Sequence, residues 1–298
     1  MSLSVRKLTS RIGAVVEGAD LNAPAGPELA AELRDALNTH KALVFDKADL
    51  DDAGQQRVAG WFGELTTAHP TVPGVANQPN VLPVDSEHGK SNQWHTDVTF
   101  VVNPPQVTTL RSIVIPPYGG ETLIANQAAA YRDLPGSLRD LADSLRAVHT
   151  NKYDYAKPVA RTELEREYDE IFVSTIYETE HPVVRVHPLT GERGLFIGGF
   201  VRQFQGVSKS ESAALVKIFQ SYVTRPENIV RWSWSPNQLV IFDNRITQHY
   251  AIDNYDNQPR RLNRVTVAGD IPVGVDGRRS HAISGDASSY SNVLEYAV

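Results

Sequence analysis

The sequence predicts a mainly β protein, a jelly-roll barrel with a few buttressing helices outside it. Short β-branched and aromatic runs bounded by glycine or proline recur along the whole chain, as in Ala42–Phe45 and Gln238–Phe242, and such runs are typical of strands. Helical periodicity is confined to a few stretches. Because no repeat, low-complexity tract or linker divides the chain, we expect one domain over residues 1–298.

Composition excludes several classes of protein. The chain has 298 residues, 41% of them hydrophobic, with a net charge of −6 and no cysteine. The charge gives no field that would attract nucleic acid or a membrane surface. Without cysteine, disulfides, iron–sulfur clusters and thiolate nucleophiles are excluded. The N-terminus lacks the apolar core of a signal peptide, and no run reaches the ~18 apolar residues of a membrane span, so we expect a cytoplasmic protein.

The first third of the chain alternates strands and helices. Residues 4–18 indicate two short strands, and Leu29, Leu33 and Leu37 predict an amphipathic helix over 27–38. A buried strand at 42–45 precedes a second helix over 51–62, which Gly63 ends. Residues 66–93 are rich in proline and predict a loop with a short strand near Val81.

The remaining elements follow the same logic. The β pattern predicts strands at 94–100, 106–115, 122–124, 183–186, 195–197, 230–234, 238–242 and 262–268. Helices are predicted over 127–145, with a break at Pro135–Gly136, and after the capping box Ser208–Glu211. Residues 151–180 are acidic and aperiodic, which favours a lid. The serine-rich segment 284–298 is expected to be peripheral.

The segment Trp94-His95-Thr96-Asp97-Val98-Thr99-Phe100 carries the first candidate site. If it is a strand, residues i and i+2 point the same way, and His95 and Asp97 lie side by side. This pair is two thirds of a two-histidine, one-carboxylate iron site, which needs one more histidine. On its own, the pair fits equally a hydrogen-bonded histidine beside a surface aspartate.

Three further motifs offer complementary chemistry. His249 follows a buried strand and could reach back to His95, although a satisfied core histidine is the commoner case. Arg260 and Arg264 share a face if extended, and arginine forks match carboxylate or sulfonate groups; a solvated edge strand is the alternative. In Gly119-Gly120-Glu121-Thr122, the glycines would let the backbone approach a ligand and Thr122 offers a hydroxyl, although Gly-Gly alone marks only a turn.

Together and in this order, these motifs resemble the taurine dioxygenase family of Fe(II)- and 2-oxoglutarate-dependent oxygenases. The resemblance runs from Ile12-Gly13-Ala14 to Gly269-Asp270 and includes His181-Pro182-Val183-Val184-Arg185. Within the family it is closest to the alkylsulfatase branch, through His149-Thr150-Asn151-Lys152-Tyr153-Asp154-Tyr155. The resemblance implies a double-stranded β-helix fold, in agreement with the barrel predicted above.

The resemblance also implies residue roles. His95, Asp97 and His249 would bind iron, and Thr122 and Arg260 would hold the distal carboxylate of 2-oxoglutarate. The sulfate or sulfonate of the substrate would be held by Arg264, His69 and the backbone of Val98, and its organic part would face Tyr153, Tyr155 and Phe200. We assign no chemistry to the other histidines, His40, His88, His149, His181, His187 and His281, although His149 is a candidate for the pocket entrance.

The implied reaction hydroxylates the carbon next to a sulfate ester with O2, releasing aldehyde, sulfate, succinate and CO2. Val72 and Ser91 stand where taurine enzymes carry a tyrosine and an asparagine, which favours a medium-chain alkyl sulfate over taurine because an unpaired ammonium group is costly to bury. A taurine or sulfonate dioxygenase, or an oxygenase of another small anion, is the alternative. A zinc hydrolase is a further alternative because it uses the same ligand types, but it gives Thr122 and Arg260 no role. A non-catalytic binding barrel is the last alternative, and it would not need an intact triad. The family also implies a homodimer or homotetramer.

Overall fold

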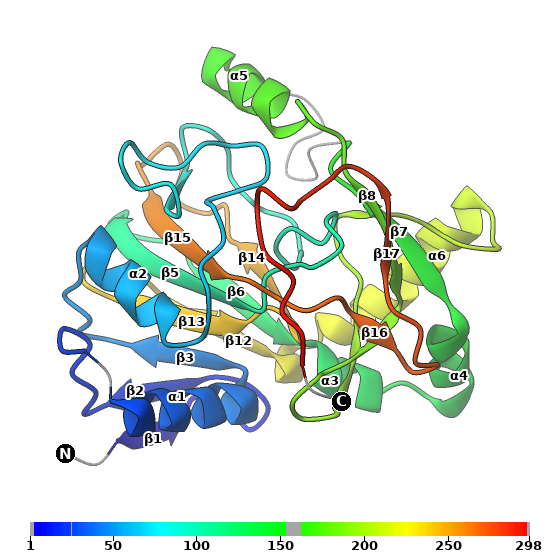
Figure 1. The fold of residues 1–298 in the computed structure, drawn as a ribbon, viewed down its shortest axis with the longest axis horizontal. Coiled ribbons are helices and arrows are strands. Elements are labelled where there is room, and N and C mark those ends of the chain that lie inside the picture. The colour runs from blue at the N-terminus through cyan, green and yellow to red at the C-terminus, as the bar shows by residue number, and fades with distance from the viewer. Residues whose placement is uncertain (1–2, 25, 153–161, 297–298) are drawn as a thin grey trace.

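The computed structural model describes residues 3–24, 26–152 and 162–296, and it is mostly sheet with few helices, as predicted (Figure 1). The largest sheet has seven strands and is antiparallel except for the β2–β3 pair. Its strands, in spatial order, are β1 (Ser4–Lys7), β2 (Ala14–Glu17), β3 (Ala42–Phe45), β13 (Leu239–Asp243), β5 (Val107–Val114), β15 (Arg261–Val267) and β4 (Leu82–Asp85).

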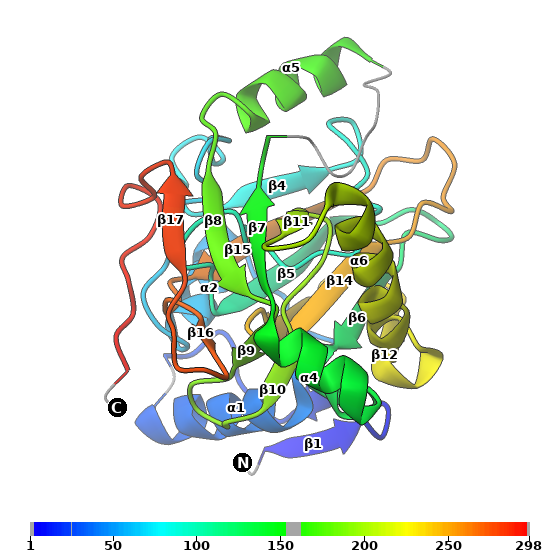
Figure 2. The same ribbon diagram turned by 90° about the vertical axis from the view of Figure 1, so that its right-hand side faces the viewer.

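Three smaller sheets complete the β structure. The first, which carries part of the site, comprises β12 (Ile229–Trp232), β6 (Thr122–Asn126) and β14 (Thr247–Ala251). The second comprises β11 (Val201–Phe204), β7 (Arg146–Thr150), β8 (Glu178–Pro182) and β17 (His281–Ser284), and faces the viewer in Figure 2. The third comprises β10 (Arg193–Leu195), β9 (Val184–Val186) and β16 (Val273–Gly274).

The helices lie outside the sheets, where the periodicity predicted most of them. They are α1 (Pro27–His40), α2 (Asp52–Gly60), α3 (Gln127–Arg132), α4 (Gly136–Ser144), α5 (Glu163–Phe172), α6 (Lys209–Val223) and the short 3-10 helix η1 (Pro226–Asn228). The break at Pro135–Gly136 separates α3 from α4, and Ser208 caps α6 through a complete capping box, as predicted. None of the helices in the described ranges is long and apolar enough to cross a bilayer.

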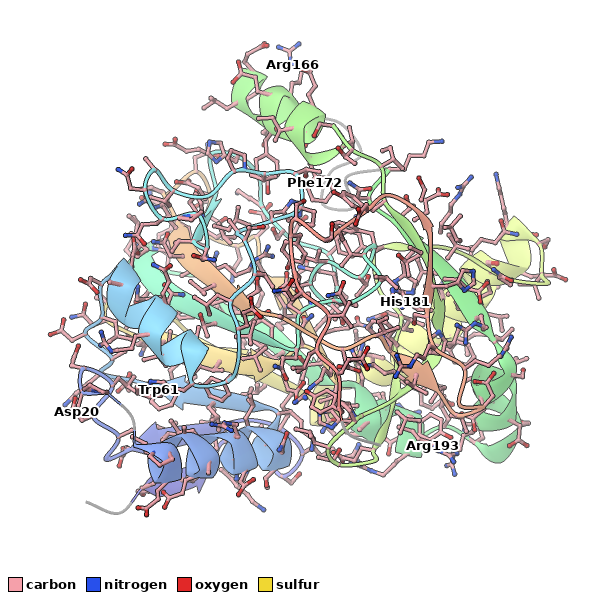
Figure 3. The ribbon with its side chains drawn as sticks, in the orientation of Figure 1. Asp20, Trp61, Arg166, Phe172, His181 and Arg193 are labelled. Atoms are coloured by element: carbon pink, nitrogen blue, oxygen red, sulfur yellow. The ribbon has the colours of Figure 1, made fainter. Side chains whose placement is uncertain are left out.

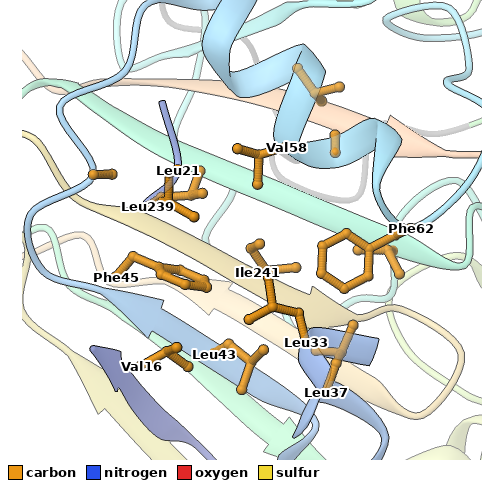
Figure 4. Packing of buried hydrophobic residues seen from close by; sticks show 14 of the residues in the cluster. Val16, Leu21, Leu33, Leu37, Leu43, Phe45, Val58, Phe62, Leu239 and Ile241 are labelled. Atoms are coloured by element: carbon orange, nitrogen blue, oxygen red, sulfur yellow. The ribbon is translucent and has the colours of Figure 1, made fainter. Parts of the chain in front are cut away.

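The main apolar core lies between the large sheet and helices α1 and α2 (Figure 4). Leu33 and Leu37 of α1 face Leu43 of β3 and Ile241 of β13, all at most 2% exposed. Burying such side chains stabilises the fold by roughly 1.5–3 kcal/mol each. The core fixes β13 and β5, and through them β15, so that the strands that carry the site have a rigid support.

Two segments have structure that the sequence analysis did not predict. Residues 151–180 contain a regular helix, α5, with a capping box at Thr162 and Glu165, and their last residues begin β8. The helix lies apart from the sheets (Figures 1 and 2), and its Tyr168 and Phe172 pack in the apolar cluster that contains Phe100 and Phe200. The C-terminal segment is not wholly peripheral, because Ala287, Tyr290 and Ser291 are buried.

Candidate active site

His95 and His249 are brought together by main-chain pairing. The two residues form an isolated antiparallel bridge, with N–H to O distances of 3.1 and 2.8 Å in the two directions. The strand predicted over 94–100 is wrong, because the chain turns immediately after the bridge, at Asp97 to Phe100. Asp97 therefore meets His95 through this turn, not through the alternation of a strand.

The three side chains could hold a metal ion. One ligand atom from each of His95, Asp97 and His249 lies within 4.8 Å of the others, and all three residues are buried. The Nε2 atoms of His95 and His249 are each 3.9 Å from Oδ1 of Asp97. Within the described ranges no other cluster of at least three such groups occurs.

The protonation states suit a metal ligand set. Burial lowers the pKa of His95, and burial with the neighbouring His95 ring lowers the pKa of His249 to about 3, so both imidazoles are neutral near pH 7. Burial opposes ionisation of Asp97, but the Arg264 guanidinium and the hydrogen bond from Thr108 help to hold the pKa of this carboxyl below its usual range. Two neutral imidazoles and a carboxylate are the donors that ferrous iron takes in oxygenases.

Neighbouring groups orient two of these donors, His95 and Asp97. Nδ1 of His95 donates to the Gln93 carbonyl at 2.7 Å, which leaves Nε2 as the nitrogen with the lone pair. The Thr108 hydroxyl donates to Oδ2 of Asp97 at 2.8 Å, whereas Oδ1 faces the histidines and also accepts from Arg264. The residues present therefore fit an iron(II) centre.

The turn after Asp97 is strained and firmly held. Val98 has φ of 55°, a left-handed conformation that is an outlier for a β-branched residue. On one side, Asn244 accepts a hydrogen bond from the Asp97 amide at 2.9 Å. On the other, His181 donates to the Thr99 carbonyl at 2.7 Å and His149 contacts the Thr99 hydroxyl at 2.9 Å.

The same contacts show where His149 and His181 lie. His149 and His181 are buried at 1% and 0% exposure, so His149 does not lie at an entrance. Burial lowers the pKa of both rings, which are therefore neutral. They support the turn at Val98 and do not line the pocket that contains the triad.

Arg260 and Thr122 lie together in that pocket. Arg260 is 4% exposed, and it donates to the Gly120 carbonyl at 2.8 Å and to the Thr122 hydroxyl at 3.3 Å. Within the described residues no carboxylate forms an ion pair with Arg260. A buried guanidinium without a carboxylate partner is suited to bind an anionic ligand.

The Gly119–Gly120 pair admits protein atoms, not a ligand, contrary to the expectation. Both glycines have positive φ, and a Cβ on Gly120 would come within 2.9 Å of Cδ of Arg260. A Cβ on Gly119 would lie 2.3 Å from the Asn254 carbonyl oxygen. The glycines thus make room for the Arg260 side chain and for the loop that carries Asn254.

Arg264 and His69 line the same pocket on the Asp97 side. Nη1 of Arg264 lies 2.5 Å from Oδ1 of Asp97, and Nη2 donates to the Ala68 carbonyl at 3.3 Å. Burial and the Arg264 charge lower the pKa of His69 to about 3. Its Nδ1 accepts from the amides of Thr71 and Val72, both at 3.2 Å, so the proton of this neutral ring is on Nε2.

Aliphatic and aromatic side chains form much of the remaining wall. Val98 and Phe200 line the pocket as expected, whereas Tyr153 and Tyr155 lie outside the described residues. Sequence reasoning missed Tyr168 and Phe172 of α5 (Figure 3 shows Phe172), although the capping box at Thr162 signals their helix. It also missed His88, whose ring stacks on Tyr168 with centroids 5.8 Å apart and an interplanar angle of 9°.

Comparison with known proteins agrees with this geometry. Residues 4–266 match the family described as "Taurine catabolism dioxygenase TauD, TfdA family". An α-ketoglutarate-dependent sulfate ester dioxygenase of Pseudomonas putida is 48% identical over 94% of each chain, and an alkylsulfatase of Acinetobacter baylyi is 45% identical over 92% of this chain and 88% of its own. The crystal structure of a taurine dioxygenase from Burkholderia xenovorans superimposes with a TM-score of 0.82, at 37% identity over 97% of both chains. The chain belongs to the TauD/TfdA family of dioxygenases.

Proposed function

We propose that this protein is an Fe(II)- and 2-oxoglutarate-dependent dioxygenase that oxidises sulfate esters. The observation that carries the proposal is one pocket in which a buried His–Asp–His set lies beside two buried arginines, Arg260 and Arg264. The relatives from Pseudomonas and Acinetobacter support the sulfate ester as substrate class. Iron bound at the triad, with 2-oxoglutarate and O2, supplies hydroxylation of the carbon that bears the ester oxygen. The hydroxylated carbon then loses sulfate and becomes an aldehyde, while 2-oxoglutarate becomes succinate and CO2.

The chain's own residues perform the positioning. Arg260 and Thr122 hold the distal carboxylate of 2-oxoglutarate, because Arg260 is a buried cation that contacts the Thr122 hydroxyl, whereas Arg264 is already paired with Asp97. Arg264 and the Nε2–H of His69, helped by the Val98 amide, hold the sulfate group. A fixed anion places the adjacent carbon over the triad, and such orientation lowers the barrier.

Alternative activities fit the pocket less well. A zinc hydrolase would use the same triad, but it gives no role to Arg260, which is buried without a carboxylate partner among the described residues. Taurine is the second candidate substrate because a taurine dioxygenase shares the fold at 37% identity. Ser91 lines the pocket, whereas Val72 lies in the apolar cluster behind it, so neither supplies a strong partner for an ammonium group.

A graded series of linear alkyl sulfates tests the substrate class. Tyr168, Phe172 and Phe200 offer apolar surface to an alkyl chain, and burial contributes about 0.8 kcal/mol per methylene. We expect kcat/KM to rise with chain length until the pocket is full, with taurine a poor substrate. Sulfate release and 2-oxoglutarate consumption are measured together. A preference for taurine, or no sulfate from any ester, would rule out the proposed substrate class.

We further propose that α5 belongs to a lid over this pocket, within the range 151–180. Its Tyr168 and Phe172 line the pocket, while Arg166 points to solvent (Figure 3). We expect amide hydrogen exchange in 163–172 to slow when Fe(II), 2-oxoglutarate and an alkyl sulfate are present together. Equal exchange in the free and fully liganded protein would mean that the helix is a static part of the wall.

The same family membership supports four broader proposals. We propose that the sheets close into a jelly-roll barrel, that residues 1–298 form one domain, and that the protein works as a homo-oligomer in the cytoplasm. A crystal structure tests the barrel, and the number of transitions in calorimetric unfolding tests the single domain. Light scattering tests the oligomeric state, and cell fractionation tests the location.

A further inference from the structure

The C-terminal segment 285–296, expected to be peripheral, packs behind the part of the pocket that His69 and Arg264 line. Tyr290 is 2% exposed and belongs to one apolar cluster with Ala68, Val98 and Phe200. The match to the family ends at residue 266, so this segment follows the matched region. It is also tied down further along, because the Leu294 amide donates to the Gly269 carbonyl at 3.0 Å and Asn103 donates to the Asn292 carbonyl at 3.0 Å.

Three consecutive residues connect Tyr290 to the groups that would bind the anion. The Thr67 amide donates to the Tyr290 carbonyl at 2.9 Å. The next carbonyl, of Ala68, accepts from the Arg264 guanidinium at 3.3 Å. The residue after that is His69, whose ring lines the pocket. A displacement of Tyr290 therefore shifts the main chain that sets both His69 and Arg264.

The Tyr290 ring reaches the same strand from behind. Its hydroxyl lies 3.5 Å from the Thr266 hydroxyl, which is 2.6 Å from the Thr66 hydroxyl. Thr266 and Arg264 are two residues apart on β15 and point to the same face. The buried ring thus fills the space between the segment 66–69 and the strand that carries Arg264.

We propose that Tyr290 is a positioning residue for the sulfate-binding pair His69 and Arg264. It touches no substrate, and it acts by fixing Thr67 and the packing behind β15. The inference rests on the proposed function in so far as the anion is the sulfate of an ester. Binding of 2-oxoglutarate should not depend on Tyr290, because Arg260 is held by Gly120 and Thr122 and not by the segment 66–69.

Kinetics of Tyr290→Ala separate positioning from general damage. We expect KM for an alkyl sulfate to rise roughly tenfold or more, since small misplacements of binding groups cost up to ~100-fold, while KM for 2-oxoglutarate stays within about twofold. Tyr290→Phe keeps the ring and the main chain, so its KM for the ester should equal that of the wild type. Val293→Ala, an exposed substitution in the same segment, is the matched control.

Amide hydrogen exchange and sulfate binding test the inference without relying on turnover. Exchange of the Thr67 amide should accelerate in Tyr290→Ala, and affinity for inorganic sulfate, measured by calorimetry, should fall. If the wild type releases sulfate from no ester, the proposed function fails, while these two readouts still decide the role of Tyr290. An unchanged KM for the ester, or an equal rise in both KM values, would overturn the proposal. If Tyr290→Ala does not fold, Tyr290→Leu keeps an apolar side chain and is read in the same way.

Discussion

Replacing His95 with alanine is expected to abolish turnover and to weaken Fe(II) binding strongly. His95 contributes a neutral Nε2 to a three-donor set, and its loss leaves one nitrogen and one carboxylate. Binding is measured anaerobically by equilibrium dialysis with metal analysis, and turnover by 2-oxoglutarate consumption. The dialysis readout distinguishes a lost ligand from a loss of catalysis alone.

Two companion variants sharpen this result. Thr108→Val removes the hydroxyl that holds Oδ2 of Asp97 and should reduce metal affinity by about 10–100-fold, as is common for groups that orient a metal ligand. His281→Ala changes a histidine whose side chain is 60% exposed on β17, and should leave both readouts unchanged. Wild-type Fe(II) affinity in His95→Ala would mean that the triad is not the metal site.

Replacing Arg260 with alanine is expected to raise KM for 2-oxoglutarate, whereas Arg264→Ala should act mainly on the sulfate ester. Arg260 is buried without a carboxylate partner among the described residues, and losing a charged contact of this kind costs roughly 2–5 kcal/mol. Arg264 instead lies against Asp97 and the segment that carries His69. Initial rates are measured with each substrate varied at saturation of the other.

Arg261→Ala provides the control, because Arg261 adjoins Arg260 but is only partly buried and does not line the pocket. Its two KM values should match those of the wild type. If Arg264→Ala carries the 2-oxoglutarate defect and Arg260→Ala the ester defect, the two roles are reversed. Equal defects in both variants would indicate that the arginines bind a single ligand.

The part of the fold that follows from local patterns was predictable. The spacing of Leu33 and Leu37 predicts α1, and the capping box at Ser208 predicts the start of α6, because both signals act within one or two turns of chain. Apolar runs likewise predict β3 and β13, which are buried along their whole length. The helix α5 was missed because most of its residues are charged, although its capping box and the four-residue spacing of Tyr168 and Phe172 are local helix signals.

The sequence by itself determined the chemical types at the site: two histidines, an aspartate and two arginines, in a pattern that resembles one enzyme family. Only the tertiary structure decided how they meet. His95 and Asp97 converge through a strained turn at Val98, because distant groups from Asn244, His149 and His181 hold that turn. Secondary-structure propensity depends on neighbouring residues in the sequence and does not include such long-range contacts. For the same reason, the serine-rich composition of the C-terminal segment did not predict that Tyr290 is buried behind His69 and Arg264.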